Sequence, residues 1–381
     1  MTVRRVVLAM SLLLMAACSR DGANGSAQQP GTSIGLRYLR AQDDPGFAKA
    51  DEPRPLTFPA DHGSHPQFRT EWWYFTGNLE SPDGNLYGFE LTFFRVGLRP
   101  PEVDSRRRSA WASNQIWMAH LAVTDAAKGR FVARERIARE ALGLAGAEPA
   151  AAHVFVKGWF AARAGDREHE RWQLGARDEE VGLQLSLATD DAPVLNGDGG
   201  LDPKGPEPGN ASYYYSLPRL ATTGVIQIEG REIAVQGSAW MDREWSTSAL
   251  GDDVAGWDWF GLRLSDGGSL MFYRLRRHDG TADEFSGGMV VDGAGRGRRL
   301  GRDDVGLTPT EYWTSPLRGT RYPIAWRVNV PSVQLELELR PYIPDQELNL
   351  SVRYWEGAVR GTGTGRGGPV TANGYLELTG Y

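Results

Sequence analysis

The segment GSAWMDREWSTS, residues 237–248, places three charged residues between two tryptophans. Asp242, Arg243 and Glu244 stand in a stretch whose other residues are typical of a β-strand. Exposed strands seldom carry two tryptophans, and buried strands seldom carry three charges. The segment therefore predicts either two catalytic carboxyl groups in an aromatic pocket or a buried ion-pair network that stabilises a barrel.

Strand geometry separates these charges. Successive side chains alternate between the two faces of a strand, so Trp240, Asp242 and Glu244 share one face and Arg243 lies on the other. The two carboxyl groups would stand roughly 7 Å apart, which is one two-residue repeat. If their face lines the inside of a barrel, burial and mutual repulsion raise the pKa of at least one of them. A carboxylic acid that stays protonated near neutral pH can protonate an unreactive substrate.

Other aromatic residues support a pocket. Trp257 and Trp259 alternate on one face of the next expected strand, in GWDWFGLRL. Glu71 precedes two tryptophans, and Tyr214 stands within a run of three tyrosines. Tryptophan faces stabilise cations as well as apolar ligands, so an acid beside them could generate and shelter a carbocation.

A purely structural role fits the same residues. Arg243 or Arg263 could pair with one of the carboxylates, and the tryptophans could belong to the core. The histidines in DHGSH, residues 61–65, together with His120 lack the spacing of a metal site. The sequence contains no HExxH, P-loop, GxSxG or dinucleotide-binding motif. We therefore expect no metal and no cofactor.

The first 17 residues have the features of a bacterial lipoprotein signal peptide. Arg4 and Arg5 precede an apolar run over residues 6–15, which is shorter than the ~18–20 residues that a membrane span needs. Met-Ala-Ala-Cys follows the pattern of a lipobox and ends at Cys18, the only cysteine of the chain. We expect Cys18 to be lipidated, which leaves no thiol for a disulfide.

Residues 18–50 are expected to form a flexible tether between this lipid and the folded body, since the stretch begins with Gly, Ser, Gln and Pro. Ser19 follows the cysteine, where an Asp is associated with retention at the inner membrane. We therefore expect a protein of the bacterial cell envelope, anchored by its lipid in the outer membrane and facing the periplasm. A net charge of −6 argues against a nucleic-acid partner.

Period-two alternation dominates the rest of the chain and predicts an all-β fold. The turn ESPDGN, residues 80–85, separates two expected strands, and the apolar residues of 181–189 and of 333–340 alternate. Residues 134–146 fit either a helix or a strand followed by a loop, and residues 193–211 read as a long Gly/Pro loop. About fifteen to twenty strands fit, as in sandwiches and barrels. We place two β-domains at residues 51–230 and 231–381.

Several longer stretches resemble the AttH-like family, which includes bacterial carotenoid 1,2-hydratases, also called hydroxyneurosporene synthases. These stretches are HPQFRTEWWYFTGNL (65–79), QIWMAHLAVTD (115–125), ASYYYSLPRLATTG (211–224), GSAWMDREWS (237–246), YWEGAVRG (354–361) and GYLELTGY (374–381). The resemblance implies two lipocalin-like antiparallel β-barrel domains packed together. It also implies a hydro-lyase that adds water to a terminal isoprenoid double bond without a cofactor, with Asp242 as the acid and Glu244 as its neighbour.

These observations lead to one functional hypothesis and two alternatives. We expect an envelope lipoprotein that acts on an apolar isoprenoid or lipid-like molecule, with Asp242 protonating a C=C bond and Glu244 positioning water. The residues expected to line the pocket are Trp240, Trp257, Trp259, Glu71 and Tyr214. The alternatives are a non-catalytic lipid or isoprenoid carrier and a component of an envelope transport complex. A location outside the cytoplasm separates this chain from the site of carotenoid synthesis, so its substrate can differ from a carotenoid.

Overall fold

The computed structural model describes residues 45–381 except 102–112, 149–151, 167–168, 249 and 252. The predicted signal peptide, Cys18 and most of the predicted tether lie outside the described residues. Within the described part of the chain, no helix has the length and apolar character needed to cross a membrane.

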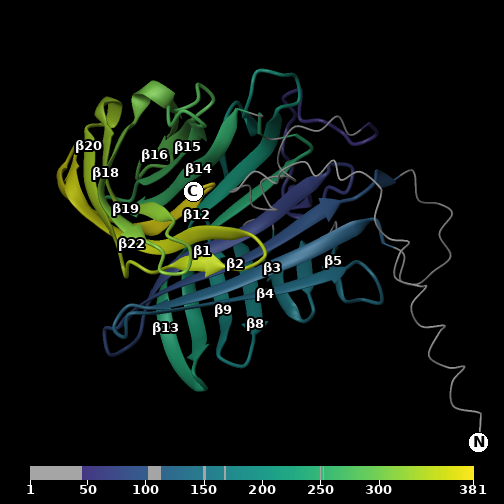
Figure 1. The fold of residues 1–381 in the computed structure, drawn as a ribbon, viewed down its shortest axis with the longest axis horizontal. Helices are drawn as coiled ribbons and strands as arrows, with labels where there is room; N and C mark the ends of the chain where they lie inside the picture. The colour runs from purple at the N-terminus through teal and green to yellow at the C-terminus, as the bar shows by residue number, and fades with distance from the viewer. Residues whose placement is uncertain (1–44, 102–112, 149–151, 167–168, 249, 252) are drawn as a thin grey trace, which may run out of the picture. The chain divides into compact units, whose positions relative to one another are not determined.

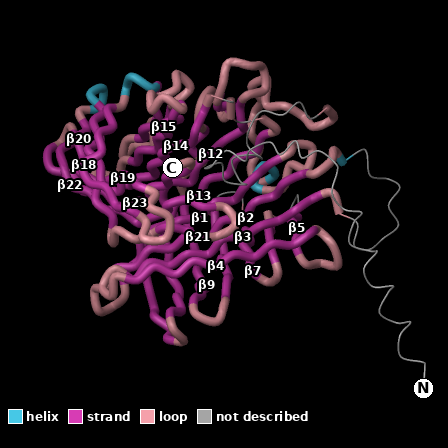
Figure 2. Tube along the Cα trace, in the orientation of Figure 1, coloured by secondary structure: helices cyan, strands magenta, loops and turns pink. Residues whose placement is uncertain are grey.

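Strands form nearly all the regular structure of the described residues, where the helices are three single 3-10 turns (Figure 2). The first sheet and its connections contain η1 (Ala60–His62), β1 (Thr70–Glu80), β2 (Leu86–Gly97), β3 (Gln115–Asp125), β4 (Arg130–Arg139), β5 (Ala145–Glu148), β6 (His153–Val156), β7 (Trp159–Arg163), β8 (Glu170–Arg177), β9 (Val181–Thr189), β10 (Val194–Leu195), β11 (Leu201–Pro203), β12 (Ala211–Ile228) and β13 (Arg231–Ser246). The second contains β14 (Val254–Leu264), β15 (Ser269–Arg277), β16 (Gly287–Val291), β17 (Gly297–Gly301), η3 (Arg302–Asp304), β18 (Gly306–Thr314), β19 (Arg321–Val330), η4 (Pro331–Val333), β20 (Leu335–Pro341), β21 (Glu347–Asn349), β22 (Arg353–Gly365) and β23 (Gly368–Thr379).

The first sheet curls into a nearly closed antiparallel barrel. Its strand order is β4-β3-β2-β1-β13-β12-β9-β8-β7-β6-β5, with β10 and β11 paired to β12 (Figure 1). Arg136 of β4, the strand at one end of the sheet, reaches strands near the other end, because its guanidinium donates to the carbonyl oxygens of Lys157, between β6 and β7, and of Arg177, the last residue of β8. The barrel interior is filled by apolar side chains from all of its longer strands.

The second sheet is a half-barrel with the order β17-β16-β15-β14-β23-β22-β20-β19-β18 and β21 paired to β22. The all-β prediction with two packed lipocalin-like barrels is confirmed. Strand β13 pairs with both β1 and β12, so residues 231–246, which we assigned to the second domain, belong to the first sheet. The chain passes from one sheet to the other between Ser246 and Val254.

Local patterns predicted several strands correctly. The turn at 80–85 connects β1 to β2, and Gly84 adopts the positive φ of +79° that a tight turn there requires. The expected apolar face of β9 is buried in the barrel. Its residues are Val181, Leu183, Leu185 and Leu187.

The helix considered for residues 134–146 is wrong, and the alternative of a strand followed by a loop is correct. Residues 130–139 form β4, which pairs along its whole length with β3. The arginines of this segment have good intrinsic helix propensity, but pairing at the sheet edge overrides that propensity. The predicted loop at 193–211 contains the two short strands β10 and β11.

A buried ionic network ties the segment before β1 to the barrel. The carboxylate of Glu71, which has no solvent exposure, accepts hydrogen bonds from Arg95 and Arg243. Arg95 also donates to the carbonyl oxygens of His65 and Phe68, at 3.1 and 2.7 Å. Burial alone would raise the pKa of Glu71, but the two guanidinium groups hold it well below its usual range. Arg243 therefore has the structural role that the sequence left open.

Replacing Glu71 by Gln should destabilise the fold by about 3–5 kcal/mol, because two buried guanidinium groups lose their only shared carboxylate. Urea unfolding followed by tryptophan fluorescence measures this change. The matched variant Glu311→Gln removes an exposed partner of Arg340 and should change stability by less than about 1 kcal/mol. Equal stability of the two variants would show that the charge of Glu71 is dispensable.

Candidate functional site

The two faces of β13 meet different surroundings, as the alternation predicted. Met241 points into the barrel core, and Arg243 reaches Glu71 on the same face. Asp242 and Glu244 lie on the other face and line a cavity between the two sheets. From the sequence we considered the case in which this face lines the inside of a barrel, whereas the structure places it between the sheets. The barrel interior is already filled with apolar side chains, and the face of β13 that carries Asp242 and Glu244 turns toward the second sheet.

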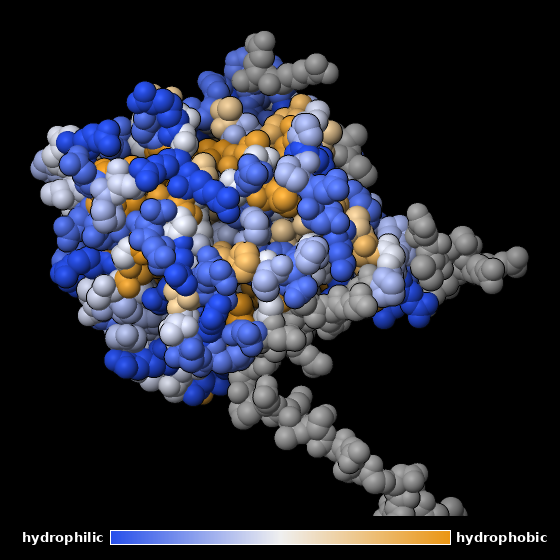
Figure 3. Space-filling view, turned by 90° about the horizontal axis from the view of Figure 1, so that it is seen from above, coloured by the Kyte–Doolittle hydropathy of each residue, from blue (hydrophilic) through white to orange (hydrophobic). Residues whose placement is uncertain are grey.

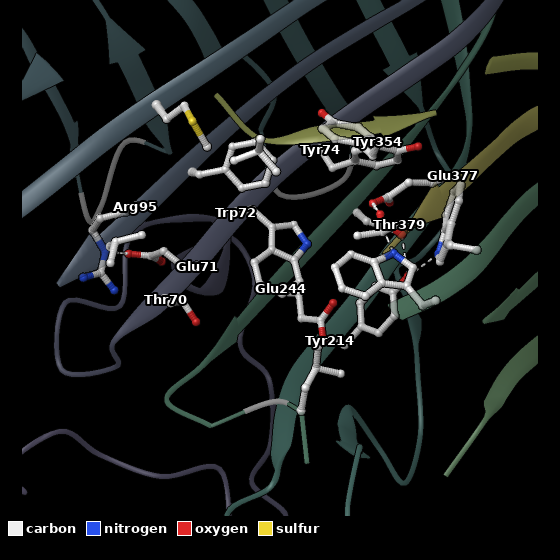
Figure 4. A pocket seen from close by; sticks show the side chains of 18 of the residues that line it. Thr70, Glu71, Trp72, Tyr74, Arg95, Tyr214, Glu244, Tyr354, Glu377 and Thr379 are labelled. Atoms are coloured by element: carbon white, nitrogen blue, oxygen red, sulfur yellow. Dashed lines mark hydrogen bonds and ion pairs between the residues drawn. The ribbon is translucent and has the colours of Figure 1, made fainter. Parts of the chain in front are cut away.

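This cavity has a volume of about 390 Å³ and mainly aromatic walls (Figure 4). The first sheet contributes Trp72, Tyr74 and Tyr214, and the second contributes Trp257 and Trp259. These rings come from three strands, β1, β12 and β14, which the packing of the two sheets brings together. The cavity has the composition expected for an apolar ligand with a few polar contacts.

One side of the cavity opens through apolar residues of three adjacent strands. Phe94, Met118 and Ile137 stand next to one another in register on β2, β3 and β4, and all three line the cavity. Ile137 is 43% exposed, so the apolar lining continues to the surface. Hydrophobic residues are visible between hydrophilic ones on the face shown in Figure 3. An apolar molecule that enters here would stay in contact with apolar side chains from the surface to the cavity.

Asp242 is enclosed by hydrogen-bond donors. The hydroxyl of Tyr214 donates to Oδ2, while Ser216 Oγ and Trp240 Nε1 each donate to Oδ1 at 2.6 Å. The side chain is nearly buried, and burial raises its pKa to about 7 although these donors oppose the shift. The charge of Glu244 adds a smaller upward contribution. Near neutral pH the group therefore exists in both protonated and ionised forms, as a general acid requires.

Tyr214 lies between Asp242 and the second sheet. Its hydroxyl oxygen accepts a hydrogen bond from Trp259 Nε1 at 3.1 Å while it donates to Asp242. Burial and the neighbouring carboxylates raise the pKa of Tyr214 well above its ordinary value. The phenol therefore remains protonated and can pass a proton between Asp242 and a molecule in the cavity.

Glu244 belongs to a separate ionic cluster that the sequence did not reveal. Lys204 Nζ lies 3.6 Å from Glu244 Oε1 and 2.6 Å from Asp202 Oδ2, and Tyr273 donates to the same Asp202 oxygen at 2.9 Å. Burial alone would lower the pKa of Lys204, but the two carboxylates and Tyr273 raise it above its usual range. The ammonium group thus stays charged.

The pairing places Glu244 beside a permanent cation. Burial still raises the pKa of Glu244, although Lys204 and a hydrogen bond from Ser212 oppose the shift. Lys204 and Asp202 come from the predicted loop at 193–211. No local signal in this loop indicated a lysine in a pocket.

Glu377 of β23 is the third carboxyl group of the cavity and was also missed. It accepts hydrogen bonds from Trp257 Nε1 at 3.1 Å and Thr379 Oγ1 at 3.0 Å. Burial, with a further contribution from Glu90, raises its pKa to about 8. Its position within the alternating C-terminal stretch GYLELTGY is the one sequence signal that could have indicated it.

The remaining predicted residues have different positions. Trp257 and Trp259 line the cavity as expected, whereas Trp240 lies behind Asp242 and is buried. Glu71 is at the margin of the cavity, beside Arg95 (Figure 4), and Arg95 and Arg243 of the barrel hold its carboxylate. Arg263 contacts Asn78 rather than either carboxyl group of β13.

The histidines are engaged in structural contacts. His65 Nε2 lies 3.0 Å from Asp61, and His120 Nδ1 lies 2.6 Å from the hydroxyl of Tyr354. Among the described residues, no group of three His, Cys, Asp or Glu side chains is arranged to hold a metal ion.

The raised pKa of Asp242 predicts a pH-dependent difference in stability. The ordinary value is 3.8 and the folded value about 7, so the folded state retains a proton that the unfolded state has lost. Wild-type stability should therefore decline relative to Asp242→Asn as pH rises from about 4 to 7, and the difference should be constant above that range. Urea unfolding at several pH values measures it. Asp190→Asn, at an exposed site, is the matched control, and parallel curves for all three proteins would contradict the assignment.

Comparison with known proteins gives one family match and two informative structures. A family model described as AttH-like matches residues 49–381. The chain is similar to an AttH-like protein from Nitrosomonas europaea, with 36% sequence identity, a TM-score of 0.78 and coverage of 88% of this chain and 100% of the other. Kievitone hydratase from Nectria haematococca shares 14% identity, with a TM-score of 0.66 and coverage of 88% and 98%, which shows a common fold. No curated protein sequence matched the chain.

Proposed function

The chain belongs to the AttH-like family, and we propose that it is a cofactor-free hydratase. It would add water to a C=C bond of an apolar isoprenoid or lipid-like molecule. The observation that carries the proposal is Asp242, a buried acid with a pKa near 7 at the wall of an aromatic cavity. The fold shared with kievitone hydratase supports the reaction class.

The reaction would begin with proton transfer to one alkene carbon. Asp242 supplies the proton through the hydroxyl of Tyr214, and the π electrons of the alkene form the new C–H bond. The other alkene carbon becomes a cation, which the ring faces of Trp257 and Trp259 stabilise.

Water would complete the reaction. Glu244, oriented by Lys204, holds a water molecule whose oxygen forms a C–O bond with the cation. The surplus proton of this water returns to the Asp242 carboxylate, so the net change is the addition of one water molecule. Glu377 is mostly protonated at neutral pH and offers a second neutral donor across the cavity.

Two substitutions distinguish a role in proton transfer from a structural role. Asp242→Asn should abolish turnover, and Tyr214→Phe should reduce it by roughly 10²–10⁴, the usual contribution of general acid catalysis. The matched variant Tyr213→Phe loses a hydroxyl that bonds Glu52 outside the cavity, so its turnover should be unchanged. Wild-type activity should fall as pH rises through about 7, because the acid form of Asp242 is lost.

Mass spectrometry of lipids extracted from the purified proteins supplies the substrate for these assays. Asp242→Asn should retain an alkene, and wild type should carry the same molecule heavier by one water. An unmodified lipid shared by both proteins would instead establish the carrier, which the apolar cavity also fits. In that case the carboxyl groups would have only a structural role.

The variant Glu377→Gln tests which of the two carboxyl groups with a raised pKa, Asp242 or Glu377, is the acid. Glutamine keeps a neutral donor and an acceptor at this position, so turnover should stay within about tenfold of wild type. Kinetics on the extracted alkene provide the measurement. A complete loss of turnover in Glu377→Gln, with activity retained in Asp242→Asn, would assign the proton donor to the second sheet.

The cellular setting belongs to the same proposal. Lipidation of Cys18 would hold the protein at the envelope, facing the periplasm, where its apolar opening has access to membrane lipids. A role as a component of an envelope transport complex remains the third hypothesis, for which we identified no specific contact surface.

A further inference from the structure

A second hollow lies at the opposite end of the seam between the sheets. The aromatic cavity is lined by residues near the start of β1 and of β14, whereas this groove includes Asn78 near the end of β1 and Arg263 near the end of β14. Its volume is about 1060 Å³. Arg219, Ser238 and Tyr342 are among its other polar lining residues. The groove therefore differs in chemistry from the aromatic cavity.

Arg263 is a buried cation without a carboxylate partner. It is 8% exposed, and its guanidinium donates to Asn78 Oδ1. In the part of the chain that the structure describes, no Asp or Glu lies within ion-pair distance of it. Its cross-strand neighbours, Ser269 and Asn373, are uncharged. Burial lowers the pKa of Arg263 to about 10, as expected for a guanidinium that lacks a compensating anion.

Four other buried or half-buried arginines of the described residues have such compensation. Arg95 and Arg243 share Glu71, as described above. Arg274 and Arg276 share Asp258, at 2.6 and 3.2 Å. A buried charge without a partner is costly, so its retention at the wall of a groove points to a partner that comes from outside the chain.

Two further groups could contact the same partner. Arg219 is close enough to Arg263 to lower its pKa, and its own carboxylate contact is a 3.7 Å pair with the exposed Asp191. The hydroxyl of Ser238 has no hydrogen-bond partner among the residues that the structure describes. A ligand oxygen could replace the contact with Asp191 at little cost, since exposed ion pairs contribute less than about 1 kcal/mol.

We propose that this groove binds an oxyanion, the phosphate or carboxylate group of a polar ligand, with Arg263 as the buried contact and Arg219 at the rim. The planar fork of a guanidinium matches both kinds of group through two parallel hydrogen bonds. The site is separate from the aromatic cavity and does not depend on the proposed hydratase reaction.

Calorimetric titration of the full chain with inorganic phosphate, and separately with acetate, tests the proposal at constant ionic strength. Wild type should bind one of the two saturably, with the preferred anion identifying the ligand group. Arg263→Gln should weaken binding by about tenfold or more, the equivalent of 1.4 kcal/mol. The matched variant Arg340→Gln, exposed on the second sheet and paired with Glu311, should bind as wild type does.

The rim variant keeps the test decisive if Arg263→Gln does not fold. Arg219→Gln alters a residue whose side chain is 36% exposed, so it should fold normally and still bind the anion several-fold more weakly. Near-ultraviolet circular dichroism checks the fold of each variant. Absence of saturable binding in wild type, or equal affinity in wild type and a folded groove variant, would overturn the proposal.

Discussion

The C-terminal half of strand β13, residues 239–246, is buried on both faces, and it carries charges on both. On the barrel face, Arg243 meets Glu71, and a second arginine completes a neutralised network. On the other face, Asp242 has hydrogen-bond donors but no cation within ion-pair distance among the described residues. The position of the strand at the centre of the first sheet fixes both arrangements. A shift of one residue in the register of β13 would move Arg243 to the face of the cavity and Asp242 to the face of the barrel.

The packing of two sheets explains why the carboxyl groups of the seam have raised pKa values. Each sheet buries one face in its own core and presents a second, mostly aromatic face to its neighbour. Asp242 and Glu377 therefore leave water without gaining a full counter-charge, whereas Glu244 gains one from Lys204. The pKa values of all three carboxyl groups are raised, and at Glu244 the cation of Lys204 opposes the shift.

The sequence predicted the elements better than it predicted their partners. Alternation correctly predicted the all-β class, the position of Asp242 and Glu244 on the same face of their strand, and the apolar face of β9. Whether a strand face points into a barrel or toward a second sheet depends on long-range packing, so the location of the cavity was not predictable. Lys204 and Glu377 reach the cavity from segments far along the chain, and their recognition required the topology. Family resemblance supplied the two-barrel architecture, which periodicity alone could not specify.

The proposed proton donor belongs to the first sheet, whereas both sheets contribute walls of the cavity. Asp242, Tyr214 and the other donors to Asp242 belong to the first sheet, while Trp257, Trp259 and Glu377 belong to the second. Substitutions in the second sheet can therefore reshape the ligand space while the acid keeps its hydrogen bonds, apart from the contact of Trp259 with Tyr214. A scaffold divided in this way allows selectivity to diverge separately from reactivity, so proteins with this architecture can keep one acid and accept different molecules.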